Sequence, residues 1–109
     1  MYIPRQGDII FMTFNPQSGH EQGGRRPALV VSNDRYNQLT NLAMVCPITN
    51  TGSGFPLHVP LAPPAKTTGF VMCEQVKALD MEARGAEYAE TAPDDLLGEV
   101  LERLFLSLE

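Results

Sequence analysis

Hydrophobic and polar residues alternate in short blocks along the first three quarters of the chain, which predicts strands joined by polar loops. Five blocks rich in branched and aromatic residues are interpreted as strands, at 8–14, 28–32, 42–48, 55–61 and 70–79. Two prolines place the strand at 55–61 on a sheet edge, because proline cannot donate a ladder hydrogen bond. The stretch 33–41 is expected to form a turn or a single helical turn.

Near the C-terminus the apolar residues change their period. From position 91 onward they recur at steps of one, three and four, the pattern of an amphipathic helix. Thr91 is the predicted N-cap, and Asp94 and Asp95 suit the positive end of the helix dipole. Five or six short strands followed by one helix predict an α+β fold, in which a curved sheet closes partly on itself and the helix packs against it.

The chain has 109 residues, a length that fits one domain spanning 1–109. Hydrophobic residues make up 43% and charged residues 19%, the profile of a globular protein. The N-terminus has no apolar run typical of a secretory signal, and no segment is long enough to span a membrane. We therefore expect a cytoplasmic protein.

Net charge is −5, which at first argues against a nucleic-acid partner. The acidity is local, however. Residues 1–81 hold six Lys and Arg against five Asp and Glu, whereas residues 82–109 hold two against eight. A basic groove in the first part of the chain therefore remains compatible with the composition.

Cys46 and Cys73 both lie in apolar stretches, where small buried thiols are the ordinary expectation. No CxxC spacing is present, so a disulfide, a metal pair or a nucleophile is the less favoured interpretation.

The loop between the first two strands carries the densest group of chemically useful residues. It places His20, Glu21, Gln22, Arg25 and Arg26 beside two glycines. Arginine binds phosphate through a planar fork, histidine and glutamate transfer protons, and glycine lets a backbone approach a ligand closely. The group suits phosphodiester chemistry, although its composition alone also fits a solvated hairpin loop.

Several motifs resemble the MazF/PemK family of toxin ribonucleases, including its Kid and ChpB branches, over essentially the whole chain. They are GDII at 7–10, FNP at 14–16, GHEQ at 19–22, RPALVVS at 26–32, VCPIT at 45–49, TGFV at 68–71, EQVK at 74–77 and ARG at 83–85. The resemblance implies a small, SH3-like, partly open β-barrel of five to seven strands with a C-terminal helix. It also implies a homodimer with an RNA groove at the subunit interface.

The same resemblance implies a reaction and a partner. Family members cut single-stranded RNA within short motifs, without metal or another cofactor. The ribose 2′-hydroxyl is the nucleophile, and the products are a cyclic phosphate and a 5′-hydroxyl. A co-expressed MazE-like antitoxin, whose acidic tail occupies the groove, is the expected partner.

Residue roles are carried over from the family by position. Arg26 matches the essential arginine and is assigned to stabilising the phosphate, because guanidinium stays protonated. Thr49 matches the catalytic threonine, and Glu21 is the candidate base. His20 matches the Kid branch and is expected to contact the phosphate or share the role of base.

Glu74 occupies the place of an acid proposed as base in the Kid branch, but Met72 stands where that branch has an arginine. This departure shifts our hypothesis toward Arg26 and Thr49. The predicted RNA-binding residues are therefore His20, Gln22, Arg25, Phe14, Asn33, Asn50, Glu74, Gln75 and Lys77. Phe55 also lies near a loop that could contact RNA, although Phe14 and Phe55 both suit a core.

Two alternatives stay open at this point. One is a non-catalytic toxin on the same fold, such as a CcdB-like gyrase binder, which the pairing of Arg26 with Thr49 argues against. The other is a family member that keeps the fold and antitoxin binding but no longer cuts RNA.

Overall fold

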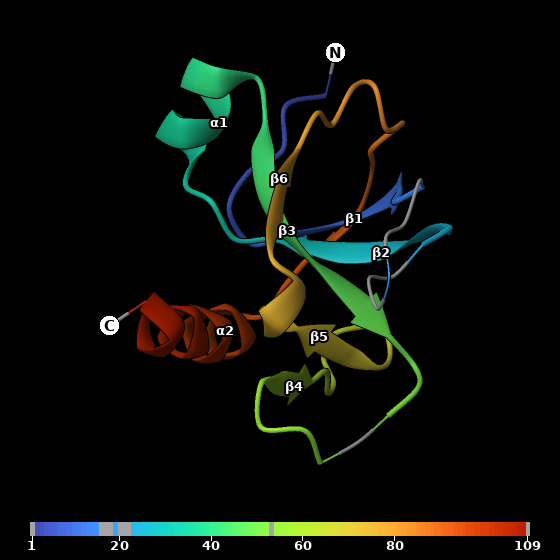
Figure 1. Ribbon diagram of the computed structural model, residues 1–109, viewed down its shortest axis with the longest axis vertical. Helices are drawn as coiled ribbons and strands as arrows, with labels where there is room; N and C mark the ends of the chain where they lie inside the picture. The colour runs from blue at the N-terminus through green and yellow to red at the C-terminus, as the bar shows by residue number, and fades with distance from the viewer. Residues whose placement is uncertain (1, 16–18, 20–22, 53, 109) are drawn as a thin grey trace.

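The computed structural model describes residues 2–15, 19, 23–52 and 54–108 of the chain. Its α+β architecture is one strongly curved sheet with a long helix against one face and a short helix beyond one end, as Figure 1 shows. The elements in chain order are β1 (Asp8–Thr13), β2 (Arg25–Val30), α1 (Asp34–Thr40), β3 (Ala43–Thr49), β4 (His58–Pro60), β5 (Phe70–Met72), the 3-10 turn η1 (Cys73–Gln75), β6 (Lys77–Leu79), β7 (Glu87–Thr91) and α2 (Asp94–Leu108).

The strands pair antiparallel in the order β4-β5-β3-β2-β1-β7, and β6 also pairs with β3. Among the described residues β4 and β7 form the two edges, so the barrel expected from the sequence is open. β3 is the strand that joins the two halves of the sheet. One of its edges pairs with β2, while the other pairs first with β6 and then with β5.

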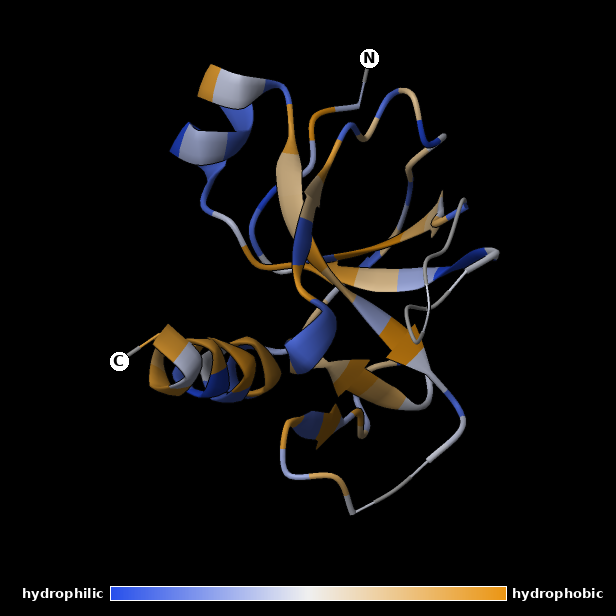
Figure 2. Ribbon diagram, viewed as in Figure 1, coloured by the Kyte–Doolittle hydropathy of each residue, from blue (hydrophilic) through white to orange (hydrophobic). Residues whose placement is uncertain are grey.

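Successive residues of the central strands point to opposite faces and enter two separate cores. Ile9, Leu29 and Cys46 belong to the core that α2 closes with Leu96 and Val100. On the opposite face lies a second core, made by Ile10, Met12, Phe14, Ala28, Val30, Ala43, Val45 and Met81. Figure 2 shows apolar residues along the central strands and along α2, with polar residues at η1 and at the start of β2.

Both cysteines are free and buried, as predicted. Burial raises the pKa of the Cys46 thiol strongly, and it raises the pKa of Cys73 to about 11. Thiols with raised pKa values stay protonated near neutral pH, which fits a packing role.

Three sequence-based predictions need correction, and one strand was not predicted. The single strand expected at 70–79 is two strands, β5 and β6, separated by η1. A further strand, β7, was not foreseen in its polar sequence. Thr91 is the last residue of β7 and not a helix N-cap, because α2 begins at Asp94. The turn or single helical turn expected at 33–41 is a longer helix of seven residues, α1, capped by the Asn33 side chain.

No helix in the described part of the chain has the length and apolar character needed to cross a membrane.

Candidate active site

Two of the predicted catalytic residues lie at the same end of the sheet, one at the start of β2 and one at the end of β3. These strands are antiparallel, with Ala28 opposite Pro47. This pairing brings the start of β2, which holds Arg26, toward the end of β3, which holds Thr49. Ala28 and Val45 both enter the second core, so by the alternation of side chains along a strand Arg26 and Thr49 lie on that same face of the sheet.

The Arg26 guanidinium is held by backbone carbonyls. Its Nε donates to the carbonyl oxygen of Gly23 at 3.0 Å, and Nη1 donates to that of Ile48 at 3.4 Å. The side chain is half-buried, and no carboxylate among the described residues forms a salt bridge with it. Carbonyls orient the guanidinium without neutralising its charge, which suits it to bind an anion.

Thr49 is 6% exposed, and its hydroxyl faces the turn that follows β3. Its Oγ1 lies 2.9 Å from Thr51 Oγ1 and accepts the backbone N–H of Thr51 at 3.2 Å. The hydroxyl is therefore fixed by the local turn, next to the carbonyl that Arg26 contacts.

The loop between β4 and β5 packs closely against the end of β3. Gly69 has φ of +113°, and a Cβ on it would lie 2.3 Å from the carbonyl oxygen of Thr49. Only glycine permits this approach. Thr68 Oγ1 also donates to Asn50 Oδ1 at 3.0 Å, so the loop and the strand end are tied together.

The same loop is anchored to β7 by a carboxylate. Glu90 accepts from the backbone N–H groups of Lys66 and Thr67 and from the Thr67 hydroxyl. The hydroxyl bond, helped by the two backbone bonds, lowers the pKa of Glu90. Nothing in the sequence pattern pointed to this residue, because its partners lie 23 and 24 positions away.

The segment that carries His20, Glu21 and Gln22 lies outside the described residues at those three positions. The residues on either side of it are joined by hydrogen bonds. Asn15 Oδ1 accepts the backbone N–H of Gly24 at 2.8 Å, and Phe14 N donates to the Gly24 carbonyl at 2.9 Å. Arg84 Nη1 donates to the carbonyl of Asn15 at 2.8 Å. Arg84 thus supports the loop, a role that the sequence did not reveal.

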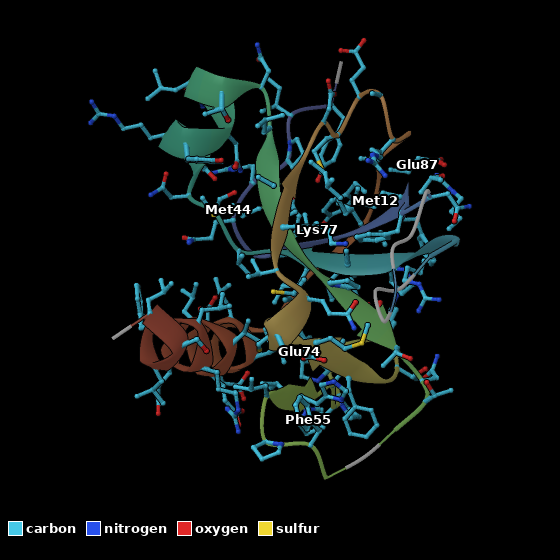
Figure 3. The ribbon with its side chains drawn as sticks, in the orientation of Figure 1. Met12, Met44, Phe55, Glu74, Lys77 and Glu87 are labelled. Carbon is cyan, nitrogen blue, oxygen red and sulfur yellow. The ribbon has the colours of Figure 1, made fainter. Side chains whose placement is uncertain are left out.

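Glu74, Gln75 and Lys77 follow β5 on η1 and β6. Glu74 pairs with His58, whose Nε2 lies 2.9 Å from its Oε2. Gln75 Nε2 lies 3.8 Å from Met72 Sδ, and Lys77 lies opposite Val45 of β3. Figure 3 shows Glu74 and Phe55 near β4 and β5, away from Met12 and Glu87.

Some side chains of β4 and β5 lie on the same face of the sheet as Arg26 and Thr49. Thr49 lies opposite Phe70, and His58 lies opposite Met72, two residues further along β5. His58 was not among the predicted site residues. Its partner Glu74 is 16 positions away, and only the pairing of β4 with β5 brings the two together.

Three predicted RNA-binding residues lie elsewhere. Arg25 neighbours Arg26 on β2 and so points to the other face, where it bonds to Glu87 and donates to the Gly85 carbonyl at 2.8 Å. Asn33 caps α1, beyond the opposite end of β2. Phe14 is 2% exposed and packs in the second core.

No group of three or more metal-binding side chains occurs among the residues that the structure describes.

Comparison with known proteins agrees with the family suggested by the motifs. Residues 5–108 match the model of the PemK-like, MazF-like toxin of type II toxin-antitoxin systems. Endoribonuclease PemK of Escherichia coli is 38% identical over 104 residues, covering 91% of this chain and 77% of that protein. Endoribonuclease toxin ChpB of Escherichia coli strain K12 is 41% identical over 107 residues, covering 91% and 89%.

Solved structures give the same result for the fold. MazF (Form-I) from Deinococcus radiodurans has a TM-score of 0.92 and 42% sequence identity, covering 99% of this chain and 98% of that one. A MazE-MazF structure (Form-II) from the same organism has a TM-score of 0.85 and 35% identity, covering 99% and 97%. The chain therefore belongs to the family of PemK-like, MazF-like toxins of type II toxin-antitoxin systems.

Proposed function

We propose that this chain cuts single-stranded RNA within short sequence motifs and without a metal ion, as the toxin of a type II toxin-antitoxin pair. The general activity, that of an endoribonuclease toxin, is inferred from the family to which the chain belongs and from relatives named as endoribonucleases. The single observation that supports the chemistry is the hydrogen bond from the Arg26 guanidinium to the carbonyl of Ile48, the residue before Thr49.

The reaction begins with attack of a ribose 2′-oxygen on the adjacent phosphorus. The P–O bond to the 5′-oxygen of the next nucleotide then breaks, which leaves a 2′,3′-cyclic phosphate and a 5′-hydroxyl. Negative charge increases on the equatorial oxygens in the transition state. A guanidinium held in advance by two carbonyls stabilises that charge without having to reorganise.

Thr49 and Glu21 complete the proposed chemistry. The Thr49 hydroxyl donates to a phosphate oxygen once RNA replaces its Thr51 partner. Glu21, supported by His20, takes the proton from the 2′-hydroxyl. A proton must also reach the leaving 5′-oxygen, and the protonated Glu21 or water supplies it.

RNA binding is proposed for the surface around Arg26 and Thr49. Gln22, Asn50, Glu74, Gln75 and Lys77 are proposed to contact RNA around the scissile phosphate, with Arg25, Asn33 and Phe14 as the less favoured members of that group. The protein acts in the cytoplasm as a homodimer of single-domain subunits. A MazE-like antitoxin blocks the groove, a proposal supported by the MazE-MazF structures of relatives.

The test is cleavage by purified protein freed of any partner and kept in EDTA. We expect single-stranded RNA to be cut into fragments with 5′-hydroxyl ends, and a 2′-deoxy substitution before the scissile phosphate to block the cut. Arg26→Ala should abolish cleavage, whereas Arg35→Ala on the exposed face of α1 removes the same charge and should not. Absence of cleavage by the native protein would favour a non-catalytic toxin or an inactive family member.

A further inference from the structure

His58 and Glu74 form a hydrogen-bonded pair on the surface that carries Arg26 and Thr49, and the proposed chemistry does not use it. Nε2 of His58 lies 2.9 Å from Oε2 of Glu74, and the side chains are 12% and 28% exposed. The two residues come from β4 and η1, which only the fold brings together. The histidine is thus largely enclosed, while its partner reaches the surface.

The environment of the imidazole favours one hydrogen-bonding arrangement. Nδ1 of His58 is buried and has no partner among the described residues. A proton on that nitrogen would be a buried donor without an acceptor, which is costly. The favoured form therefore carries its proton on Nε2 and donates it to Glu74. In this form His58 orients the carboxylate and leaves its other oxygen, Oε1, able to accept further bonds.

Aromatic rings flank this pair. The ring of Phe55 packs edge to face against His58, with centroids 5.0 Å apart, and the ring of Phe70 lies 6.4 Å away. Phe55 is 48% exposed, so its ring offers surface to a ligand. Single-stranded RNA is recognised through bases that stack on such rings and form hydrogen bonds along their edges.

The position of Glu74 is better suited to binding an RNA base than to taking part in the reaction at the phosphate. Phe70 and Met72 of β5 separate it from Thr49, which lies opposite Phe70. Met72 supplies no positive charge beside the carboxylate, and a carboxylate repels the RNA backbone. A base edge with an amino group is the RNA component that a carboxylate binds favourably.

We propose that His58 and Glu74 form a base-reading pair next to the cleavage site. A base stacks on Phe55, its exocyclic amino group donates to Glu74, and His58 holds the carboxylate in place. The pair favours adenine, cytosine or guanine over uracil, which has no exocyclic amino group and carries two carbonyl oxygens that the carboxylate repels. This inference rests on the proposed ribonuclease function and makes His58 a positioning residue that determines specificity.

The experiment is cleavage of a pool of random-sequence RNA, followed by sequencing of the 5′-hydroxyl ends. We expect the native protein to disfavour uracil at one position near the cut by about 10-fold, the size of effect that one good base contact gives. Glu74→Gln should reduce that preference, because an amide donates as well as accepts. His58→Leu should reduce it at the same position, and His58→Gln, which keeps a donor, should restore it.

The matched control is Glu102→Gln, which makes the same charge change on the exposed face of α2 and should leave the profile unchanged. Thermal unfolding of each variant shows whether it folds, and Glu74→Gln alone decides the question if His58→Leu does not. An unchanged base profile in Glu74→Gln would overturn the inference, and so would an equal loss of cutting at every sequence. A native protein that cuts no RNA would instead overturn the proposed function on which the inference depends.

Discussion

Thr67 donates both its backbone N–H and its hydroxyl to one oxygen of Glu90, at 2.7 Å and 2.6 Å. These bonds fix the loop after β4 to the edge strand β7. The loop then reaches the end of β3 through Gly69, whose backbone packs against Thr49. A carboxylate on one edge of the sheet therefore holds the loop that supports the candidate active site.

We expect this anchor to make stability depend on acid pH. The folded protein holds the pKa of Glu90 below its ordinary value of 4.5, chiefly through the Thr67 hydroxyl. The stabilisation is therefore fully present above that value, and it is lost as pH falls through the lower pKa of the folded state. Glu90→Gln should lower the midpoint of thermal unfolding at pH 7, and the difference from the native protein should shrink as pH falls below 4.5.

Glu82→Gln is the charge-matched control, since Glu82 is exposed in the turn before β7. A difference between Glu90→Gln and the native protein that stays constant from pH 7 to pH 3 would contradict the assignment to the ionised carboxylate.

Gly69→Ala should be strongly destabilising. The new Cβ would meet the Thr49 carbonyl at 2.3 Å, and φ of +113° is already unfavourable for alanine. The combined cost should be about 2 to 5 kcal/mol in the free energy of unfolding, measured by urea titration. Gly54→Ala is the control, because its φ is also positive but no atom lies within 4 Å of the added Cβ. A cost in Gly69→Ala no larger than that in Gly54→Ala would show that the loop can move away.

Arg26→Lys should reduce the rate constant of the cleavage step by about 100-fold or more while leaving the fold intact. An ammonium group cannot keep both carbonyl contacts and also present a planar fork to the phosphate. The measurement is single-turnover cleavage of one RNA substrate, with circular dichroism to check folding. Activity close to native would mean that charge alone is sufficient and that the orientation of the guanidinium is unimportant.

Thr49→Val replaces a buried hydroxyl by a methyl group of similar size. Thr51 then loses the acceptor of its N–H and the partner of its hydroxyl, so unfolding should become easier by about 1 kcal/mol. Cleavage should fall by at least about 10-fold, because the proposed phosphate donor is gone. Thr49→Ser keeps the hydroxyl and should retain most of the activity; a serine variant as slow as the valine variant would point to packing of the methyl group.

Part of the fold was predictable because it depends on local pattern. The period of the apolar residues identified α2, and the branched runs identified the central strands. β7 was not foreseen because its sequence, Glu87–Thr91, is mostly polar and exposed, and pairing with β1 alone makes it a strand. The break between β5 and β6 was not foreseen either. It arises where two strands share one edge of β3, which is a property of the tertiary structure.

The candidate site shows the same division. Arg26 and Thr49 came from motifs, and the antiparallel pairing of β2 with β3 brings the start of one strand toward the end of the other. His58 and Glu90 gave no signal in the sequence, since each depends on a partner at least 16 positions away. A single histidine in a short strand, or a single glutamate in a polar stretch, cannot be assigned a role until the pairing of the strands is known.

β3 lies at the centre of the fold, where it pairs with three other strands. It has pairs on both edges and a core on each face, so we expect the amides of its middle residues to exchange with solvent as slowly as any in the protein. We therefore expect the strand that ends in Thr49 to open only when the protein unfolds. Its part of the site then has the same geometry with and without RNA. Little ordering entropy has to be lost in that half of the site on binding.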